Sequence, residues 1–263
     1  MGTNAPRGIA GRFFCKRGGK TMIRLVERDA AKNRLLELCE KTAFGCKISS
    51  IATAYGFDKS FALFWLDTEE DVVYWLVDGV MLLSGTVLNG EAARQFIQVA
   101  GAKEILCAVR NAEALSLHPW ETGDVLKHGL EPGPCPQAPP MPSVREIYAL
   151  LEQVGMVDEF EPFYLDLSHK LRHQAALALT VPGEGGLTAC AVVSSISQRG
   201  AILSALAVQE ESRRQGIGSR LVRQMEGYFP GKAMYVFREK HKNQEFYRNL
   251  GYSKVDTWVH GKL

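Results

Sequence analysis

The segment SRRQGIGSRLV, residues Ser212 to Val222, has two arginines ahead of two glycines and then continues as an amphipathic run. Gly216 and Gly218 are poor residues for a helix interior, where each costs up to about 1 kcal/mol relative to Ala. After them, apolar residues recur at helical spacing until Pro230. Upstream, residues 201–210 (AILSALAVQE) form a nearly continuous apolar run of the length of a buried strand. The glycines are therefore predicted to lie where a strand gives way to a helix.

The start of this predicted helix is suited to hold an anion. The first N–H groups of a helix have no intrahelical partner, and the helix dipole adds partial positive charge at the same end. Glycine has no side chain to keep an anion away from the main chain. Arg213 and Arg214 add two permanent positive charges here. The segment predicts an anion site built from a strand, a basic glycine turn and a helix.

Two common nucleotide-binding patterns do not fit this segment. A Walker A loop requires a lysine after its last glycine, and Ser219 follows Gly218. A dinucleotide fingerprint requires a third glycine, and Leu221 stands at that position. The pattern that fits is [QR]-x-x-G-x-[GA], at residues 213–218. It resembles the acyl-CoA pyrophosphate loop of the GNAT superfamily of N-acyltransferases.

The sequence on both sides of this loop resembles the same family. Members continue with a helix, a strand, and a helix that carries Asn, FY and LG[FY]; here KAMYVFRE (232–239) is followed by NQEFYRNLGY (243–252). Upstream, VREIYALLEQ and FYLDLSHKLRH resemble the first two helices of the family. The resemblance covers roughly Cys135 to the C-terminus. It implies an α/β class fold, with a mixed sheet and the GNAT acyl-CoA N-acyltransferase architecture in the C-terminal half.

The resemblance also implies a reaction and a cofactor site. In the GNAT reaction an amine attacks the thioester carbonyl of acyl-CoA directly, so acetyl-CoA is the implied cosubstrate and no metal is implied. The acyl carbonyl would lie near the backbone amides of Ala207 and Val208, where two central strands splay, and the pantetheine would lie between this strand and YVFRE. Asn243 would contact the cofactor arm. The residues implied to hold the pyrophosphate are Arg213, Arg214, Gln215, Gly216, Ile217, Gly218 and Ser219.

Tyr247 is the catalytic residue that the resemblance implies, as the proton donor to the leaving thiolate. Helical spacing predicts that Phe246 and Leu250 face the core, and Tyr247, about 100° around the helix, faces the cleft. The alternative is that Tyr247 is a second core aromatic. The general base is open: Ser204 stands mid-strand where many members have a glutamate. The candidates for the general base are therefore a water relay or a carboxylate from a substrate loop.

The N-terminal part has a weaker, architectural likeness to the same family. No [QR]-x-x-G-x-[GA] pattern occurs before Arg213. This part is either a smaller, degenerate, non-catalytic GNAT-like α/β domain or an unrelated α/β module. Since every match to the family follows Glu131, a fragment that begins near Gly129 is expected to bind CoA by itself. The predicted elements are strands at 22–26, 61–67, 72–85 and 104–109, and helices at 30–41 and 91–101.

Composition changes divide the chain into four parts. Residues 1–21 are basic and contain no acidic residue, which predicts a disordered leader, a transit peptide, or an upstream start before Met22. Residues 22–130 are the N-terminal domain. Residues 131–142 are rich in proline and predict a linker or an edge strand. Residues 143–263 are the acetyltransferase domain, which begins at Ser143, a good N-cap.

Composition limits the partners. A formal net charge of +2 over 263 residues gives no global nucleic-acid footprint, and no 18-residue apolar stretch would span a membrane. The six cysteines are scattered, as in a cytoplasmic protein with reduced thiols. The expected partner is a small-molecule or peptide amine, with no nucleic acid and no membrane. The leading interpretation is an acetyl-CoA-dependent N-acetyltransferase; the alternative is a CoA-binding regulatory protein without turnover.

Overall fold

The computed structural model describes residues 22–263, so the predicted leader at residues 1–21 lies outside the described residues. The chain divides into two compact units, and both are discontinuous in sequence. The first contains the described residues up to Ile48, Tyr55–Thr122 and Thr257–Leu263. The second contains Ser49–Ala54 and Gly123–Asp256. Among residues 22–263, no helix combines the length and the apolarity needed to cross a bilayer.

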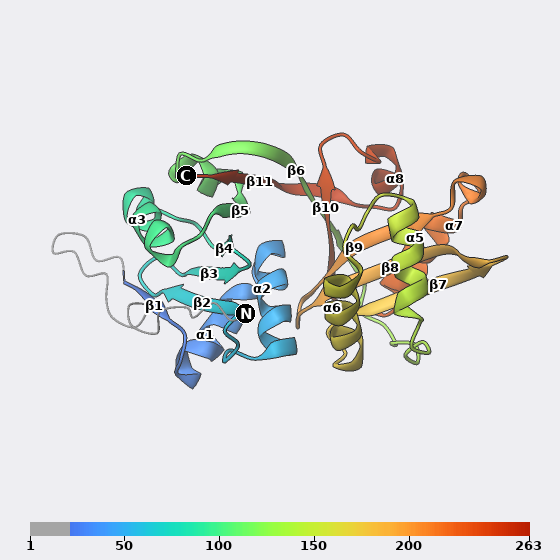
Figure 1. Cartoon of the computed structure of the whole chain (residues 1–263), viewed down its shortest axis with the longest axis horizontal. Coiled ribbons are helices and arrows are strands. Elements are labelled where there is room, and N and C mark those ends of the chain that lie inside the picture. Colours follow the sequence, from blue (N-terminus) through green and yellow to red (C-terminus); the bar gives the residue numbers. More distant parts are fainter. Residues whose placement is uncertain (1–21) are drawn as a thin grey trace. The chain divides into compact units, whose positions relative to one another are not determined.

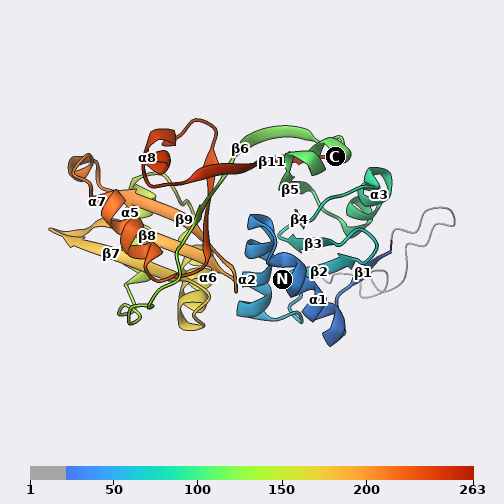
Figure 2. The ribbon, with the colours of Figure 1, turned by 180° about the vertical axis from the view of Figure 1, so that it is seen from behind.

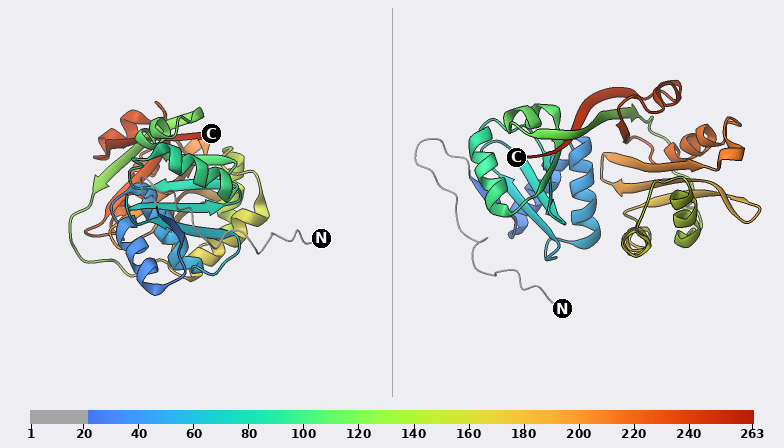
Figure 3. Two further views of the ribbon diagram at one scale, coloured as in Figure 1. Left: turned by 90° about the vertical axis from the view of Figure 1, so that its left-hand side faces the viewer. Right: turned by 45° about the horizontal axis from the view of Figure 1, so that its top comes forward.

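The first unit is a mixed sheet with helices on both faces. Its strands follow the order β1-β2-β3-β4-β5-β11, antiparallel except for the parallel pair β4 and β5. Figure 3 shows α1 and α2 on one side of this sheet and α3 on the other. The elements are β1 (Ile23–Leu25), α1 (Asp29–Cys39), α2 (Ala43–Tyr55), β2 (Ala62–Asp67), β3 (Val72–Val77), β4 (Val80–Ser84), α3 (Gly90–Ala100), β5 (Glu104–Ala108) and α4 (Val109–Ala114).

The prediction of a single strand at residues 72–85 was wrong. It is a hairpin, because Asp78 and Gly79 turn the chain between β3 and β4 with φ angles of 49° and 82°. Two consecutive residues with positive φ form the type I′ turn that suits the twist of a hairpin. The helices predicted at 30–41 and 91–101 are confirmed as α1 and α3. Helices α2 and α4 were not predicted from the sequence.

The second unit repeats this order of elements. Two helices, three antiparallel strands, a helix, a parallel strand and a short helix follow one another in both units, and a further strand ends each series. The sheet order is β6-β10-β9-β8-β7. The elements are β6 (His118–Gly129), α5 (Val144–Gln153), α6 (Phe160–Arg172), β7 (Leu177–Gly183), β8 (Gly186–Ile196), β9 (Gly200–Val208), the 3-10 turn Glu210–Ser212, α7 (Ile217–Glu226), β10 (Ala233–Glu239), α8 (Gln244–Asn249) and β11 (Ser253–Lys262).

Both faces of the second sheet are covered. Helices α7 and α8 pack on one face, against a core that includes Leu203, Met225 and Val236. Helices α5 and α6 pack on the other face, against a core that includes Ile147 and Val192. In Figure 1, α5 lies in front of this sheet, and in Figure 2, seen from behind, α7 lies in front of it. The predicted helices at both places are confirmed.

The strand that ends each series belongs to the sheet of the other unit. Residues 123–129 of β6 pair with β10 over seven register positions, from Gly123 with Glu239 to Gly129 with Ala233. Residues 258–261 of β11 pair with β5. The units therefore divide between Thr122 and Gly123, and the last seven residues complete the first unit. The proline-rich segment 131–142 contains no helix or strand and is largely exposed, as a linker would be.

Candidate active site

A gap opens between the two central parallel strands of the second unit. The register of β9 and β10, both wholly described, runs from Gly200 with Ala233 to Ile202 with Tyr235 and ends there. Beyond this point β9 continues to Val208 and β10 continues to Glu239. The far side of β10 is paired with β6 along its whole length. The gap is therefore lined by two strand edges that lie within one sheet.

The backbone of β9 directs alternate N–H groups into this gap. The Gln209 N–H donates to the Thr188 carbonyl at 2.9 Å, which points it toward β8. Directions alternate along a strand, so the Ala207 N–H also points toward β8, while those of Leu206 and Val208 point toward the β10 side. Of the two predicted acyl-binding amides, Val208 faces the gap. Leu206, which was not among the predicted site residues, provides the second amide on that side.

Two serine hydroxyls meet at bulges of β8 and β9, and Ser204 lies on β9 two residues beyond the end of its pairing with β10. The pairing of β8 and β9 shifts twice within a few residues, once at Ser204 on β9 and once at Ser194 on β8. Such paired bulges re-aim side chains, and the two hydroxyls form a hydrogen bond with each other. The Ser204 hydroxyl is also placed to donate to the Ile202 carbonyl at 3.3 Å, so in this arrangement its proton is used and Ser194 is the donor of the pair. Ser204 is exposed although β9 is a central strand.

The start of α7 presents a cradle of backbone amides. Gly216 has a φ of 74° and is the N-cap, with no side-chain cap hydrogen bond. The first intrahelical bond runs from the Arg220 N–H to the Gly216 carbonyl at 3.0 Å, so the amides of Ile217, Gly218 and Ser219 precede it. The exposed residues Arg214 and Gln215 lead into this turn.

Arg213, by contrast, is engaged with the protein itself. Its N–H donates to the Glu210 carbonyl at 3.2 Å, and its side-chain Nε donates to the Val208 carbonyl at 3.1 Å. The guanidinium therefore ties the cradle to the end of β9. Because the Arg213 N–H is already bonded, the backbone amides left to bind a pyrophosphate are those of residues 214–219. Arg213 lies next to them and contributes a positive charge.

The separate sequence motifs meet at Gly218. A Cβ placed on this residue would lie 3.7 Å from Val208 Cγ2 and 3.7 Å from the Phe246 ring. The end of β9, the start of α7 and helix α8 therefore converge at one point. Asn243 precedes α8 with a φ of 53°, is exposed, and makes no side-chain cap hydrogen bond. Its side-chain amide is exposed at the start of α8, the helix whose Phe246 ring approaches Gly218.

Tyr247, which was predicted to face the cleft rather than the core, lies in the core. It is 8% exposed and belongs to the core with Leu250, whereas Phe246 is only partly buried. Its ring lies 5.6 Å from the ring of Tyr252. Burial raises the pKa of Tyr247 to about 12, against a smaller lowering effect of nearby Arg238. The prediction that Phe246 rather than Tyr247 packs in the core was therefore wrong.

Comparison with known proteins agrees with this geometry. The family model described as the acetyltransferase (GNAT) domain matches residues 177–254. Residues 177–254 are a GNAT acetyltransferase domain. The match runs from β7 to the start of β11 and so contains the gap, the cradle and α8. A search of curated proteins finds no match.

Solved structures share the fold over both units. A GCN5-related N-acetyltransferase from Sphaerobacter thermophilus is 13% identical, with a TM-score of 0.59 and coverage of 92% of this chain and 94% of its own. A tandem GNAT protein from the clavulanic acid biosynthesis pathway is 12% identical, with a TM-score of 0.55 and coverage of 92% and 97%. A GCN5-related N-acetyltransferase from Kribbella flavida is 16% identical, with a TM-score of 0.52 and coverage of 73% and 86%. The chain therefore has a tandem GNAT fold, and the N-terminal half is GNAT-like rather than an unrelated module.

In the first GNAT-like unit, a side chain fills the position that corresponds to the gap. The parallel pairing of β4 and β5 runs from Val80 with Glu104 to Leu82 with Leu106. Beyond it, the fully buried Asn111 accepts the Val87 N–H at 3.0 Å and donates from Nδ2 to the Gly85 carbonyl at 3.0 Å. These backbone groups after β4 are therefore bound by the protein itself.

A carboxylate fills the position that corresponds to the cradle. Glu70 accepts the Leu88 N–H at 2.8 Å and the Asn89 N–H at 2.9 Å, immediately before α3. The Asn89 side chain caps the helix by accepting the Ala92 N–H at 3.1 Å. The Glu70 carboxylate and the Asn89 side chain thus already accept hydrogen bonds from the backbone amides that a pyrophosphate would need.

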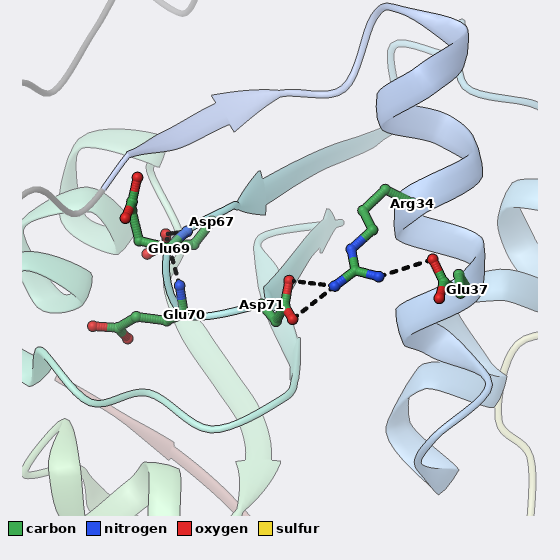
Figure 4. Close-up of polar contacts among 6 residues, drawn as sticks. All are labelled: Arg34, Glu37, Asp67, Glu69, Glu70 and Asp71. Carbon is green, nitrogen blue, oxygen red and sulfur yellow. Dashed lines mark hydrogen bonds and ion pairs between the residues drawn. The ribbon is translucent and has the colours of Figure 1, made fainter.

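The turn that carries Glu70 is itself held in place (Figure 4). The buried Asp67 accepts the backbone N–H groups of Glu69 and Glu70 at 3.0 and 3.4 Å. Burial raises the pKa of the Asp67 carboxyl, against the opposing effect of these amides. Arg34 of α1 donates to both carboxylate oxygens of Asp71 at 2.9 and 2.8 Å. Among the described residues of the two units, the open cradle next to an open gap is therefore found in the second unit and not in the first.

Proposed function

We propose that the second unit is an acetyl-CoA-dependent N-acetyltransferase that transfers the acetyl group to a primary amine of a small molecule or peptide by direct attack. The observation that carries the proposal is the convergence at Gly218. There the amide cradle of α7, the end of β9 and helix α8 lie together, beside the gap between β9 and β10. The cradle suits a pyrophosphate, and the gap suits an extended chain that hydrogen-bonds like a strand.

Each part of the site has a role in the proposal. Backbone amides of residues 214–219 bind the pyrophosphate, and Asn243 contacts the cofactor arm. The edge of β9 at Leu206 and Val208 binds the pantetheine and the acyl carbonyl. Acetyl-CoA supplies an acyl group activated as a thioester. The Val208 N–H donates to the carbonyl oxygen as negative charge develops there, which is the usual action of an oxyanion-binding amide.

The proton balance requires one proton to move from nitrogen to sulfur. The C–N bond forms, the C–S bond breaks, and the amine nitrogen loses a proton. The hydroxyls of Ser194 and Ser204 accept hydrogen bonds from the amine and from the water that takes this proton. Tyr247 donates a proton to the leaving sulfur and is reprotonated through water. A phenol with a pKa of about 12 is fully protonated at neutral pH, as a donor must be.

The first unit is proposed to be non-catalytic. Asn111 and Glu70 bind the backbone groups that the cofactor would use. Its contribution is structural, since β6 begins in the first unit and continues as residues 123–129, which pair with β10 in the second unit. The cofactor therefore binds with a stoichiometry of one per chain.

A second candidate function is a CoA-binding regulatory protein without turnover. Two observations favour it: Tyr247 is buried, and serines rather than a carboxylate lie at the bulges of β8 and β9. Both candidates require the same cradle. They differ in whether an amine releases CoA thiol from acetyl-CoA.

The deciding experiment measures CoA binding and thiol release with the full chain. Calorimetry with CoA is expected to give one site, and a thiol-release assay with acetyl-CoA and a panel of amines is expected to identify at least one substrate. The Gly216→Val variant is the control, because it places a branched side chain in the cradle. Binding without thiol release across a broad panel supports the regulatory candidate. Failure to bind CoA rejects both.

A further inference from the structure

A pocket of about 290 Å³ lies in the second unit, among residues outside the proposed cofactor site. It is formed where the end of the proline-rich linker meets the first turn of α5 and one face of α6. Tyr164, Ser168 and Arg172 follow one another at intervals of four residues and so line it from one stripe of α6. Ser143 and Arg145 line it from the start of α5.

Aromatic rings rather than a carboxylate hold Arg145. Its guanidinium carbon lies 5.2 Å from the centroid of the Phe160 ring and 5.2 Å from that of the Tyr164 ring. These contacts supply no carboxylate or carbonyl acceptor for the N–H donors of the guanidinium. The rings are fixed in turn, because Phe160 also packs edge-on against Tyr148 with centroids 5.0 Å apart. Arg145 is therefore oriented without being neutralised.

Arg172 is also oriented by a neutral partner. Its Nε donates to the Ser168 carbonyl at 3.1 Å, which leaves the two terminal nitrogens for other partners. The Ser143 hydroxyl oxygen accepts the Glu146 N–H at 3.3 Å, so its proton remains a donor. The start of α5 adds the partial positive charge of a helix N-terminus.

The balance of charge in this pocket is positive. Its lining residues include two arginines and no acid. Within residues 22–263, neither Arg145 nor Arg172 forms an ion pair with a carboxylate. Asp166, on the same helix, pairs with Lys170 at 2.8 Å instead. Both arginines are exposed, and each would attract an anion that enters the pocket.

We propose that this pocket, the α5–α6 pocket, binds the carboxylate or phosphate group of a small organic anion. Guanidinium groups match the geometry of both oxyanions with paired hydrogen bonds. The apolar lining at Met141 and Val144, beside the ring of Tyr164, accommodates the carbon skeleton of the ligand. The pocket volume suits a ligand of metabolite size.

The test titrates the full chain with sodium phosphate and, separately, with sodium succinate, by calorimetry. Saturable binding of at least one anion is expected, and the stronger of the two identifies the oxyanion. The double variant Arg145→Gln with Arg172→Gln is expected to weaken this binding at least tenfold. The matched control, Arg94→Gln with Arg110→Gln, removes the same charge from the first unit and is expected to bind like the parent chain.

The Gly216→Val variant separates this site from the proposed cofactor cradle. Anion binding that survives Gly216→Val and is lost in the Arg145 and Arg172 double variant supports the pocket, whether or not the chain binds CoA. Binding lost only in Gly216→Val, or no saturable binding, overturns it. If the double variant does not fold, nitrogen-15 spectra of the arginine side chains in the parent chain replace it. The side-chain signals of Arg145 and Arg172 are assigned with the single variants Arg145→Lys and Arg172→Lys. Both signals are then expected to shift when the anion is added. Signals that do not shift overturn the proposal.

Discussion

The Glu70 carboxylate accepts the backbone N–H of Asn89 at 2.9 Å, directly before the first turn of α3. The corresponding turn before α7 holds Gly216 and no side-chain cap. One unit thus carries its own anion at the position where the other is open to a ligand. This difference predicts that CoA binds to the second unit and not to the first. The prediction can be tested by substitutions at Glu70 and at Gly216.

Replacing Glu70 with Ala is expected to destabilise the chain by about 1–2 kcal/mol, since two amides before α3 lose their acceptor and a helix N-terminus loses its negative charge. Urea unfolding measures this change. Glu69→Ala is the matched control, because the neighbouring Glu69 is exposed and only its backbone N–H is bonded to Asp67. CoA affinity and stoichiometry should be unchanged. A second CoA site in Glu70→Ala would contradict a closed first unit, because Asn111 still fills the gap there.

Gly216→Val is expected to weaken CoA binding by about 1–3 kcal/mol, the scale of lost charge-assisted hydrogen bonds. A β-branched side chain disfavours a φ of 74° and projects into the cradle. Gly101→Val is the control for backbone strain, because Gly101 has a φ of 81° at the end of α3, with no atom within 4 Å of an added Cβ. Calorimetry should show a loss of affinity only in Gly216→Val. An equal loss in both variants would mean that strain, not the cradle, is responsible.

Local patterns in the sequence predicted much of this site. The loop at residues 213–218 and the NQEFY segment are short motifs, and each element they predicted is present. The Asp78-Gly79 turn was also readable, since Asp-Gly between apolar runs is a strong hairpin signal, but it was missed. Helix α2 was missed because Gly45 and its serines have low helix propensity. A Cβ on Gly45 would lie 2.1 Å from the Cys39 carbonyl oxygen, so packing requires glycine there.

Long-range relationships could not be predicted in this way. Strand β6 is polar over much of HPWETGDVLKHG, and its partner β10 lies about a hundred residues further along the chain. The bonds of Glu70 and Asn111 to the loop before α3 span 18 to 26 residues and follow no local pattern. The burial of Tyr247 follows from the packing of α8 on the core of the second unit, which no local pattern specifies. These features decide which unit is open, and only the folded chain reveals them.

The exchange of β6 changes what is expected of a C-terminal fragment. A fragment of residues 131–263 lacks Gly123–Gly129, so β10 becomes an unpaired edge beside the proposed cofactor gap. It is therefore expected to aggregate or to bind CoA much more weakly than the full chain. A fragment of residues 123–256, which keeps this strand, is expected to bind better. Equal binding by both fragments would show that β6 contributes nothing to the site.

Ser204→Ala is expected to lower the rate of acetyl transfer about tenfold or more while the KM for acetyl-CoA stays nearly constant, because the hydroxyl is proposed to contact the amine and not the cofactor. Ser194→Ala should have a similar effect, and the double variant should be little worse, since two hydroxyls that bond each other act as a unit. Ser253→Ala is the control, an exposed serine on β11. Full additivity of the two changes would contradict a joint role.

Tyr247→Phe tests the proposed proton donor. The change removes one oxygen and keeps the ring, so the core and CoA affinity should change little, while acetyl transfer should fall at least tenfold. Tyr252→Phe is the matched control, because Tyr252 is a buried tyrosine of the same core whose ring lies 5.6 Å away. Equal rates in Tyr247→Phe and the parent chain would leave Tyr247 as a packing residue.

The pKa of Tyr247 adds a prediction that does not depend on activity. Burial raises it to about 12, whereas a tyrosine in the unfolded chain ionises near pH 10. Below pH 10 both states are protonated and the group has no effect on the pH dependence of stability. Above pH 10 only the unfolded chain gains by losing the proton, so the free energy of unfolding falls as pH rises through the folded pKa. Denaturant unfolding at pH 8 and at about pH 11 should therefore show the parent chain losing more stability than Tyr247→Phe. An identical loss in both would mean that Tyr247 ionises freely in the folded chain, and a buried proton donor would be ruled out.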